Sequence, residues 1–154
     1  MHEQQQFLQT KLIPALRQVQ ALQAPLWGKM NARQMVEHLL DFVQVSKGKL
    51  YFPLVSPVEH LPKLRAFLMS DKPFRENTRA PVSVLGENPL PLRFETLEEA
   101  LSELEAELQY FFQLYADEPA FTTTHPVFGD LNFEDWVRLH YKHVTHHLRQ
   151  FNLL

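Results

Sequence analysis

The chain has 154 residues, 45% of them hydrophobic and 12% aromatic, which is enough to bury the core of one domain over residues 1–154. It contains no cysteine, which excludes disulfides, thiolate catalysis and zinc held by cysteine. The formal net charge of −3 excludes the broad positive surface that binding to nucleic acid requires.

The first segment, MHEQQQFLQTKL, is polar and lacks the apolar run of a secretory signal peptide. No segment approaches the roughly 20 consecutive apolar residues of a membrane-spanning helix. The absence of cysteine is also consistent with a reducing compartment. We therefore expect a cytoplasmic protein that acts on a small molecule and has neither nucleic acid nor a membrane as its partner.

The first predicted helix spans about residues 3–22, where apolar side chains recur at helical spacing. Asn31 can cap a second helix, because Gln34 follows it at the capping-box position. We expect this second helix to run to Lys47 and Gly48, since a basic residue and a glycine are typical of a helix C-terminus.

An insert over residues 49–93 follows the second helix and holds seven of the chain's 11 prolines. One short helix is predicted within it, over PVEHLPKLRAFLMS at 57–70, and the remainder is expected to be extended or looped. Loops of this length in a compact domain are usually functional. We therefore predict that the insert forms a lid or a wall of a binding site.

The third helix is predicted over residues 96–116, where Thr96 and Glu99 have the spacing of a capping box. Its many glutamates are assigned to a solvated face rather than to an acidic binding surface. Asn132 is expected to cap the last helix, over residues 132–152. Four long helices joined by two short links and one long crossover predict an all-α four-helix bundle with a capping insert.

The last predicted helix carries four of the chain's eight histidines. At about 100° per residue, His147 lies about 40° and His140 about 60° from His143. All three therefore lie on the apolar side of the helix, beside Trp136. His146 lies about 60° away in the other direction, nearer to solvent, and is not expected to bind a metal.

His38 occupies the corresponding edge of the apolar stripe on the second helix. Imidazoles at i and i+4, such as His143 and His147, lie on adjacent turns and commonly share a metal. Three imidazoles would leave a coordination position open, which is typical of a catalytic metal. We predict that these three residues bind a divalent metal, zinc or nickel, both of which suit imidazole.

Two other interpretations compete with a metal site. His38 alone could be a hydrogen-bonded core histidine. The last helix could instead be a histidine-rich surface for a partner or for anionic lipid, although its inward-facing histidines disfavour this interpretation.

Further residues are candidates around the predicted site. Asp41, one turn after His38, would act as a catalytic base, orient a ligand or simply meet solvent. His140 is the second candidate for catalysis. His125, in the turn HPVFG, and Trp136 are candidates for contact with a cofactor or substrate, with a role in loop geometry favoured for His125.

The segments PLWGKMNARQMVEHLLDF, at 25–42, and HPVFGDLNFEDWVRLHYKHVTHHLRQF, at 125–151, resemble the DinB/YfiT-like superfamily. The resemblance implies a four-helix bundle of up-down-down-up topology that often forms homodimers. It also implies one divalent metal bound by a histidine of the second helix and two histidines of a final HxxxH. In this sequence these positions are His38, His143 and His147.

Relatives of known activity include thiol-dependent transferases and isomerases, in which the metal activates a low-molecular-weight thiol. Because this chain has no cysteine, the same chemistry would need an external thiol. A hydrolase that uses metal-activated water would need the same three ligands. The resemblance thus implies a metal-dependent transferase or hydrolase. The alternative is a non-catalytic, dimeric binding or stress-associated protein with a structural or sensing metal.

Overall fold

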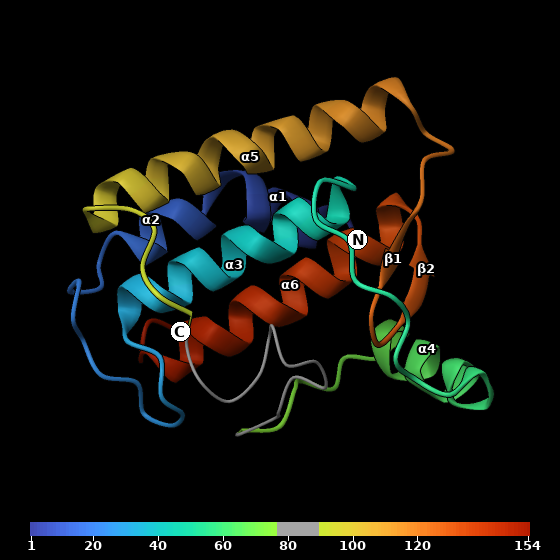
Figure 1. The fold of residues 1–154 in the computed structure, drawn as a ribbon, viewed down its shortest axis with the longest axis horizontal. Helices are drawn as coiled ribbons and strands as arrows, with labels where there is room; N and C mark the ends of the chain where they lie inside the picture. The colour runs from blue at the N-terminus through green and yellow to red at the C-terminus, as the bar shows by residue number, and fades with distance from the viewer. Residues whose placement is uncertain (77–89) are drawn as a thin grey trace.

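The computed structural model describes residues 1–76 and 90–154, which are mostly helical and include one small two-stranded sheet (Figure 1). In chain order the elements are α1 (His2–Thr10), α2 (Leu12–Leu16), α3 (Ala32–Ser46), the 3-10 helix η1 (Val58–His60), α4 (Leu61–Met69), α5 (Leu97–Asp117), β1 (Thr123–His125), β2 (Gly129–Leu131) and α6 (Phe133–Gln150). The structure therefore differs from the expected all-α class, because β1 and β2 form a small antiparallel hairpin.

The first helix is shorter than expected and is broken. α1 ends at Thr10 and α2 ends at Leu16, whereas one helix was predicted over about residues 3–22. The break lies at Lys11, three residues before Pro14, which has no amide hydrogen to donate to the carbonyl of Thr10 and whose ring crowds that carbonyl. Leu22, which the helical pattern included, is 73% exposed.

The predicted ends of α3 are confirmed. The Asn31 side chain accepts a hydrogen bond of 2.9 Å from the Gln34 amide, and the Gln34 side chain accepts one of 2.9 Å from the Asn31 amide. The helix ends at Ser46 with Lys47 as its C-cap, and Gly48 follows with a φ of 75°, a left-handed conformation that favours glycine.

The predicted N-terminal caps of α5 and α6 differ in how far they form. Thr96 accepts a hydrogen bond from the Glu99 amide, but the Glu99 carboxylate accepts one from the amide of Glu95 instead of Thr96. The capping box of α5 is therefore only half formed. Asn132 and Asp135 form a complete capping box at the start of α6.

The long helices pack side by side around the core. α3 makes its most extensive contacts with α5 and also lies along α6, while α1 packs on both α5 and α6 (Figure 1). Trp136, Phe111 and Phe151 are the largest fully buried side chains, exposed by no more than 1%. Among the described helices, none has both the length and the apolar character needed to cross a membrane.

The predicted short helix of the insert is present as η1 and α4. Two cation contacts hold this part of the insert on α6. Arg65 of α4 donates two hydrogen bonds of 3.1 Å to the Asp135 carboxylate, and Lys142 of α6 donates to the carbonyls of Ser70 and Lys72. The loop predicted for the rest of the insert falls partly on residues 77–89, which lie outside the described residues.

The hairpin was not predicted. β1 and β2 pair in antiparallel fashion, with His125 opposite Gly129, and they enclose the turn that the sequence suggested at HPVFG. Each strand has only three residues, too few for an alternating pattern to be recognised. The hairpin is fixed to α6 by a hydrogen bond of 2.8 Å from the Trp136 indole to the Thr123 hydroxyl.

Candidate metal centre

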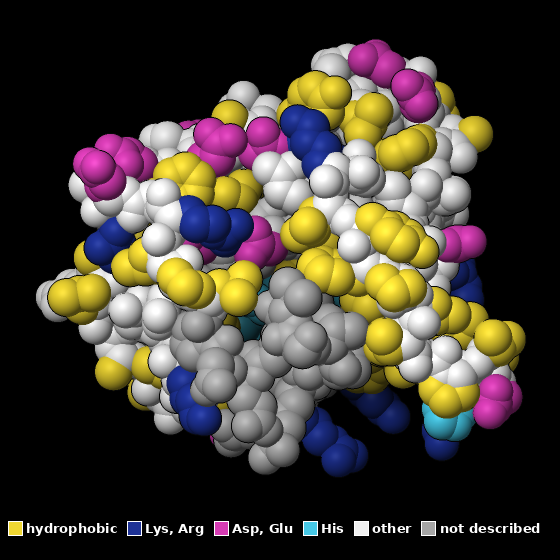
Figure 2. All heavy atoms as spheres, in the orientation of Figure 1, with side chains coloured by type: hydrophobic (Ala, Val, Ile, Leu, Met, Phe, Trp, Pro, Cys, Tyr) yellow, Lys and Arg dark blue, Asp and Glu magenta, His cyan; other side chains and the backbone are white. Residues whose placement is uncertain are grey.

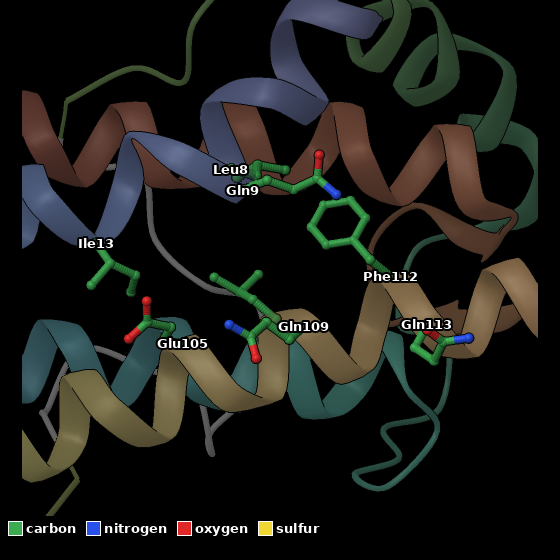
Figure 3. Close-up of a pocket in the computed structure, with 8 residues that line it drawn as sticks. Leu8, Gln9, Ile13, Glu105, Gln109, Phe112 and Gln113 are labelled. Atoms are coloured by element: carbon green, nitrogen blue, oxygen red, sulfur yellow. The ribbon is translucent and has the colours of Figure 1, made fainter.

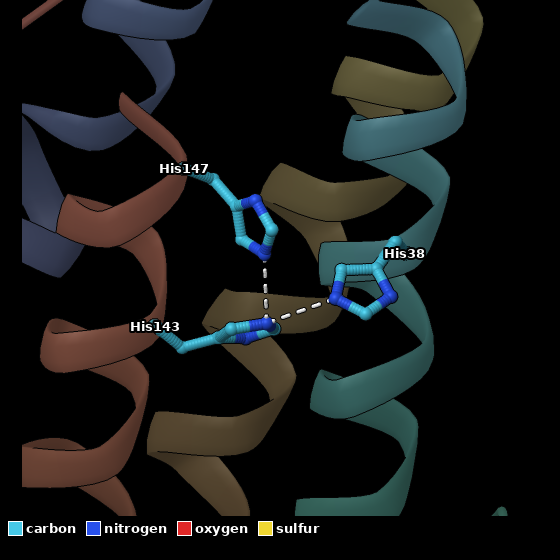
Figure 4. A group of neighbouring side chains, drawn as sticks. All are labelled: His38, His143 and His147. Atoms are coloured by element: carbon cyan, nitrogen blue, oxygen red, sulfur yellow. Dashed lines mark hydrogen bonds between the residues drawn. The ribbon is translucent and has the colours of Figure 1, made fainter. Parts of the chain in front are cut away.

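The three predicted ligands lie together between α3 and α6 (Figure 4). His143 and His147 occupy adjacent turns of α6, and the packing of α3 on α6 places His38 opposite them. The Nε2 atoms of His38 and His143 are 3.0 Å apart, and those of His143 and His147 are 3.1 Å apart. We call this group the three-histidine centre.

The spacing of these nitrogens fits a shared metal ion. Zinc–nitrogen bonds are about 2.0–2.1 Å long, so two nitrogens on one ion at angles of about 90–109° lie about 2.8–3.4 Å apart. The observed separations of 3.0 and 3.1 Å agree with this range. Imidazole suits zinc, copper, iron and nickel, so these three donors could hold a transition-metal ion.

Burial keeps the three imidazoles neutral. It lowers the pKa of His38 to about 4, with a smaller contribution from His146. Burial, followed by the charges of neighbouring imidazoles, holds the pKa values of His143 and His147 well below the ordinary value. Neutral imidazole is the form that binds metals, so the three ligands are ready to coordinate at neutral pH.

One side of the three-histidine centre is accessible. His147 is buried, but His38 and His143 are partly exposed. In Figure 2, histidine atoms are visible at the bottom of a hollow in the face where Figure 1 shows α3 and α6. Partial exposure of two of the three rings is a feature of catalytic rather than closed structural sites.

Gln150, which was not among the predicted site residues, lies directly behind His147. Its Oε1 atom is 2.7 Å from Nδ1 of His147, and its amide nitrogen donates a hydrogen bond of 2.8 Å to the carbonyl oxygen of Trp27. The available signal was the spacing, because residues at i and i+3 share one face of a helix.

Asp41 does not belong to the three-histidine centre. Both of its oxygens accept hydrogen bonds from the Arg93 guanidinium, at 2.7 and 3.0 Å, and the same guanidinium donates to Glu37 at 3.1 Å. These contacts, above all the hydrogen bond to Asp41, raise the pKa of Arg93. Asp41 is only 6% exposed, so it joins α3 to the segment before α5 instead of meeting solvent.

His140 and Trp136 lie in a buried hydrogen-bonded group instead of facing a pocket. Nε2 of His140 is 2.9 Å from the Ser46 hydroxyl, and Trp136 stacks on His140 at a centroid distance of 5.3 Å. Tyr115 donates a hydrogen bond of 2.8 Å to the Ser46 carbonyl, and Thr123 accepts one from Trp136. Burial lowers the pKa of His140 to about 3. We call these five residues the closed network.

His125 supports the hairpin. Its Nδ1 atom accepts hydrogen bonds from the amides of Val127, at 3.0 Å, and Phe128, at 3.3 Å. Its ring stacks on Phe42 at 5.6 Å and is 6% exposed. Burial, and secondarily the charge of His140, lowers its pKa to about 3. These contacts favour the role in loop geometry over contact with a substrate.

His146 lies outside the three-histidine group, but the expectation that it is near solvent is wrong. It is 8% exposed, because Trp27 and Phe74 pack on it with ring centroids at 5.5 and 5.9 Å. A helical wheel measures direction around α6, and it could not show that two loops cover this side of the helix.

A pocket of about 300 Å³ lies between α1 and α5, away from the three histidines (Figure 3). Its lining residues are Leu8, Gln9, Ile13, Glu105, Leu108, Gln109, Phe112 and Gln113. None of the candidate site residues contributes to this pocket.

A mostly helical chain with three histidines gathered from two packed helices has the features of a helical metal-binding protein. The family model described as the DinB superfamily matches residues 3–151, and the chain therefore belongs to the DinB superfamily. This match confirms the resemblance seen in the sequence and includes all three histidines. No curated protein and no solved structure matches the chain.

Proposed function

We propose that this protein is a metal-dependent enzyme in which His38, His143 and His147 bind one divalent ion, zinc or nickel. The observation that supports this proposal is the convergence of three neutral imidazoles, with Nε2 separations of 3.0 and 3.1 Å, beside a hollow in the surface. Membership of the DinB superfamily supports the same function.

The fold that we propose is the four-helix bundle of the resemblance, with up-down-down-up topology. In this arrangement α1 and α2 count as one broken helix, and α3, α5 and α6 are the other three. The insert over residues 49–93 is then the crossover between the second and third helices. The location in the cytoplasm and the homodimer stay predictions from the sequence.

A bound divalent ion would supply Lewis acidity, which lowers the pKa of a coordinated thiol or water. The residues of the chain do the remaining work. Burial keeps the imidazoles neutral, Gln150 holds the ring of His147, and the partly exposed rings of His38 and His143 face the approach of a small-molecule substrate. With no cysteine in the chain, any thiol must be an external, low-molecular-weight compound.

The carboxylates favour transfer to an external thiol over hydrolysis. Glu37 and Asp41, the acidic residues nearest to His38 in the sequence, both accept hydrogen bonds from Arg93. Both oxygens of Asp41 are bound by Arg93, and the second oxygen of Glu37, Oε2, is buried away from solvent without a hydrogen-bond partner among the described residues. Neither carboxylate is therefore placed to take a proton from water as a general base. A thiol that is activated as a thiolate needs no such base for its attack.

The test uses metal-free protein reloaded with zinc or nickel and incubated with pairs of small thiols and electrophiles. We expect one pair to be consumed in a metal-dependent reaction, with the chelated protein as the control. Protein that binds one equivalent of metal but turns over no pair would support the non-catalytic alternative. Protein that binds no divalent metal would overturn the proposal.

A further inference from the structure

We propose that the backbone carbonyl of Trp27 sets the ring tautomer of His147 through the side-chain amide of Gln150, and so keeps Nε2 of His147 free to bind the metal. This inference rests on the proposed metal centre. It assigns Gln150 as a positioning residue, and it gives the loop at Trp27 and Gly28 a role in the affinity for metal.

The tautomer follows from what each group can donate. The Trp27 carbonyl can only accept, so the end of the Gln150 amide that lies 2.8 Å from it is the nitrogen. The other end is then Oε1, which also can only accept and lies 2.7 Å from Nδ1 of His147. Nδ1 of neutral His147 must therefore carry the hydrogen, which leaves the lone pair on Nε2.

The lone pair has the direction that the metal centre needs. Nε2 of His147 is the atom that lies 3.1 Å from Nε2 of His143, inside the three-histidine centre (Figure 4). If the hydrogen moved to Nε2, it would point into the centre and block coordination. Metal-binding histidines usually donate their second N–H to an outer partner, and loss of that partner typically weakens metal binding about 10- to 100-fold.

The loop is held closely against Gln150. Gly28 has a φ of 83°, and a Cβ atom there would lie 2.9 Å from the amide nitrogen of Gln150. The Leu26 amide donates a hydrogen bond of 2.7 Å to the Gln150 carbonyl, and the Gln23 side chain donates one of 3.0 Å to the Phe151 carbonyl. Gln150 itself is 4% exposed, so its amide has little freedom to turn over.

Three variants separate the tautomer from general packing. Gln150→Leu keeps the approximate volume but removes both hydrogen bonds. Gly28→Ala adds a methyl group against the amide and strains a left-handed backbone position. Gln23→Leu is the matched control, because it removes a different glutamine hydrogen bond between the same loop and the same end of α6.

The first measurement is made without metal. Nitrogen-15 NMR of the histidine rings reports which nitrogen carries the hydrogen. In the wild-type protein we expect His147 to be protonated on Nδ1, and in Gln150→Leu we expect the Nε2-protonated form to gain population. Nε2 protonation of His147 in the wild-type protein would overturn the inference by itself, whether or not the variants fold.

The second measurement is the affinity for zinc, determined by competition with a chromophoric chelator. Gln150→Leu and Gly28→Ala should bind zinc about 10- to 100-fold more weakly, whereas Gln23→Leu should bind it as tightly as the wild type. Equal affinity in the wild type and Gln150→Leu overturns the inference and leaves the proposed function intact. If the wild type binds no zinc, the proposed function fails, and the tautomer measured without metal still decides the role of Gln150.

Discussion

The three-histidine centre and the closed network lie next to each other on α6, yet their histidines have opposite surroundings. In the closed network, the Ser46 hydroxyl donates to the Val43 carbonyl at 2.7 Å and must therefore accept from Nε2–H of His140. In the three-histidine centre, Nε2 of His147 has no hydrogen to donate. Burial makes both rings neutral, and their hydrogen-bond partners assign them opposite tautomers.

This difference shows what separates a ligand from a core histidine. Both kinds of residue lie on the same apolar arc of α6, so neither residue type nor direction distinguishes them. The distinguishing feature is the kind of partner that each polar atom has. In the closed network, Trp136, Tyr115 and His140 are each paired, whereas the Nε2 atoms of the three-histidine centre point at one another. Imidazole nitrogens that converge on one another in this way can be joined by a metal cation.

The largest expected effect comes from breaking the three-histidine centre alone. His143→Ala removes the nitrogen that lies closest to both other ligands, so metal binding should fall by more than the roughly 100-fold that loss of an outer partner can cost. Elemental analysis of the purified variant measures the change. His146→Ala is the matched control and should keep its metal. Complete loss of metal in His146→Ala would instead indicate an i, i+3 pair of ligands.

The second prediction breaks the closed network. His140→Ala leaves a cavity beside Phe111 and Trp136 and removes the partner of the Ser46 hydroxyl. The free energy of unfolding should fall by about 2–3 kcal/mol, while the metal content stays that of the wild type. Urea unfolding of the chelated variant measures the first quantity. A variant with normal stability and no metal would place His140 among the ligands and abolish the distinction between the two regions.

Local patterns were enough to predict the features that depend on one helix at a time. The caps at Asn31 and Asn132 follow from residues three positions apart, and the ligands on α6 follow from a constant angle per residue. The partner His38 could also be found, because packed helices bring the edges of their apolar stripes together. The sequence therefore predicted which three histidines come together, and their role as metal ligands stays a prediction.

The remaining features depend on contacts between distant segments. Arg93 donates a hydrogen bond to Asp41, which lies 52 positions away in the sequence. Gln150 donates one to Trp27, which lies 123 positions away. No periodicity relates such residues, so the sequence could not reveal which polar groups would be satisfied. Pro14 indicated in principle that the first helix would break at Lys11, but the apolar residues continue at helical spacing on both sides and favoured one long helix.

The third prediction uses a property that the two regions share, because both keep their histidines neutral. The pKa of His140 is about 3 in the folded protein, against about 6.5 in the unfolded chain. Between these two pH values only the unfolded chain takes up the proton, and this uptake favours unfolding. The stability that comes from keeping His140 neutral is therefore fully present above about pH 6.5 and is lost as the pH falls. For one such histidine, the free energy of unfolding decreases by about 2 kcal/mol from pH 7 to pH 5.

His140→Phe removes this titration and keeps an aromatic ring of similar size. The free energy of unfolding of the chelated variant should therefore decrease less than that of the wild type between pH 7 and pH 5, by about 2 kcal/mol. Urea unfolding at the two pH values provides the comparison. The same pH dependence in both proteins would show that His140 takes up a proton as readily in the folded protein as in the unfolded chain, and that the closed network does not exclude the charge.

The smallest expected change is in the fold itself when the metal is removed. The fully buried side chains of Phe111, Trp136 and Phe151 fill the core without contributing to the three-histidine centre, and two of the three ligands are partly exposed. Chelated protein should therefore keep a helical circular dichroism spectrum and unfold cooperatively. Its free energy of unfolding should fall only by the contribution of metal binding, which is about 2.7 kcal/mol at a metal concentration 100 times the Kd. The melting temperature should fall by the corresponding amount.

Adding zinc back should restore the melting temperature, and less completely below about pH 6, where protons compete for the imidazoles. This outcome is expected because the ligands lie at the edge of the apolar stripes, so that removing an ion leaves the packing between the helices in place. A spectrum of disordered chain after chelation would mean that the metal holds α3 and α6 together. The three-histidine centre would then be the more structural of the two regions, and the main physical reason for proposing an enzyme would be lost.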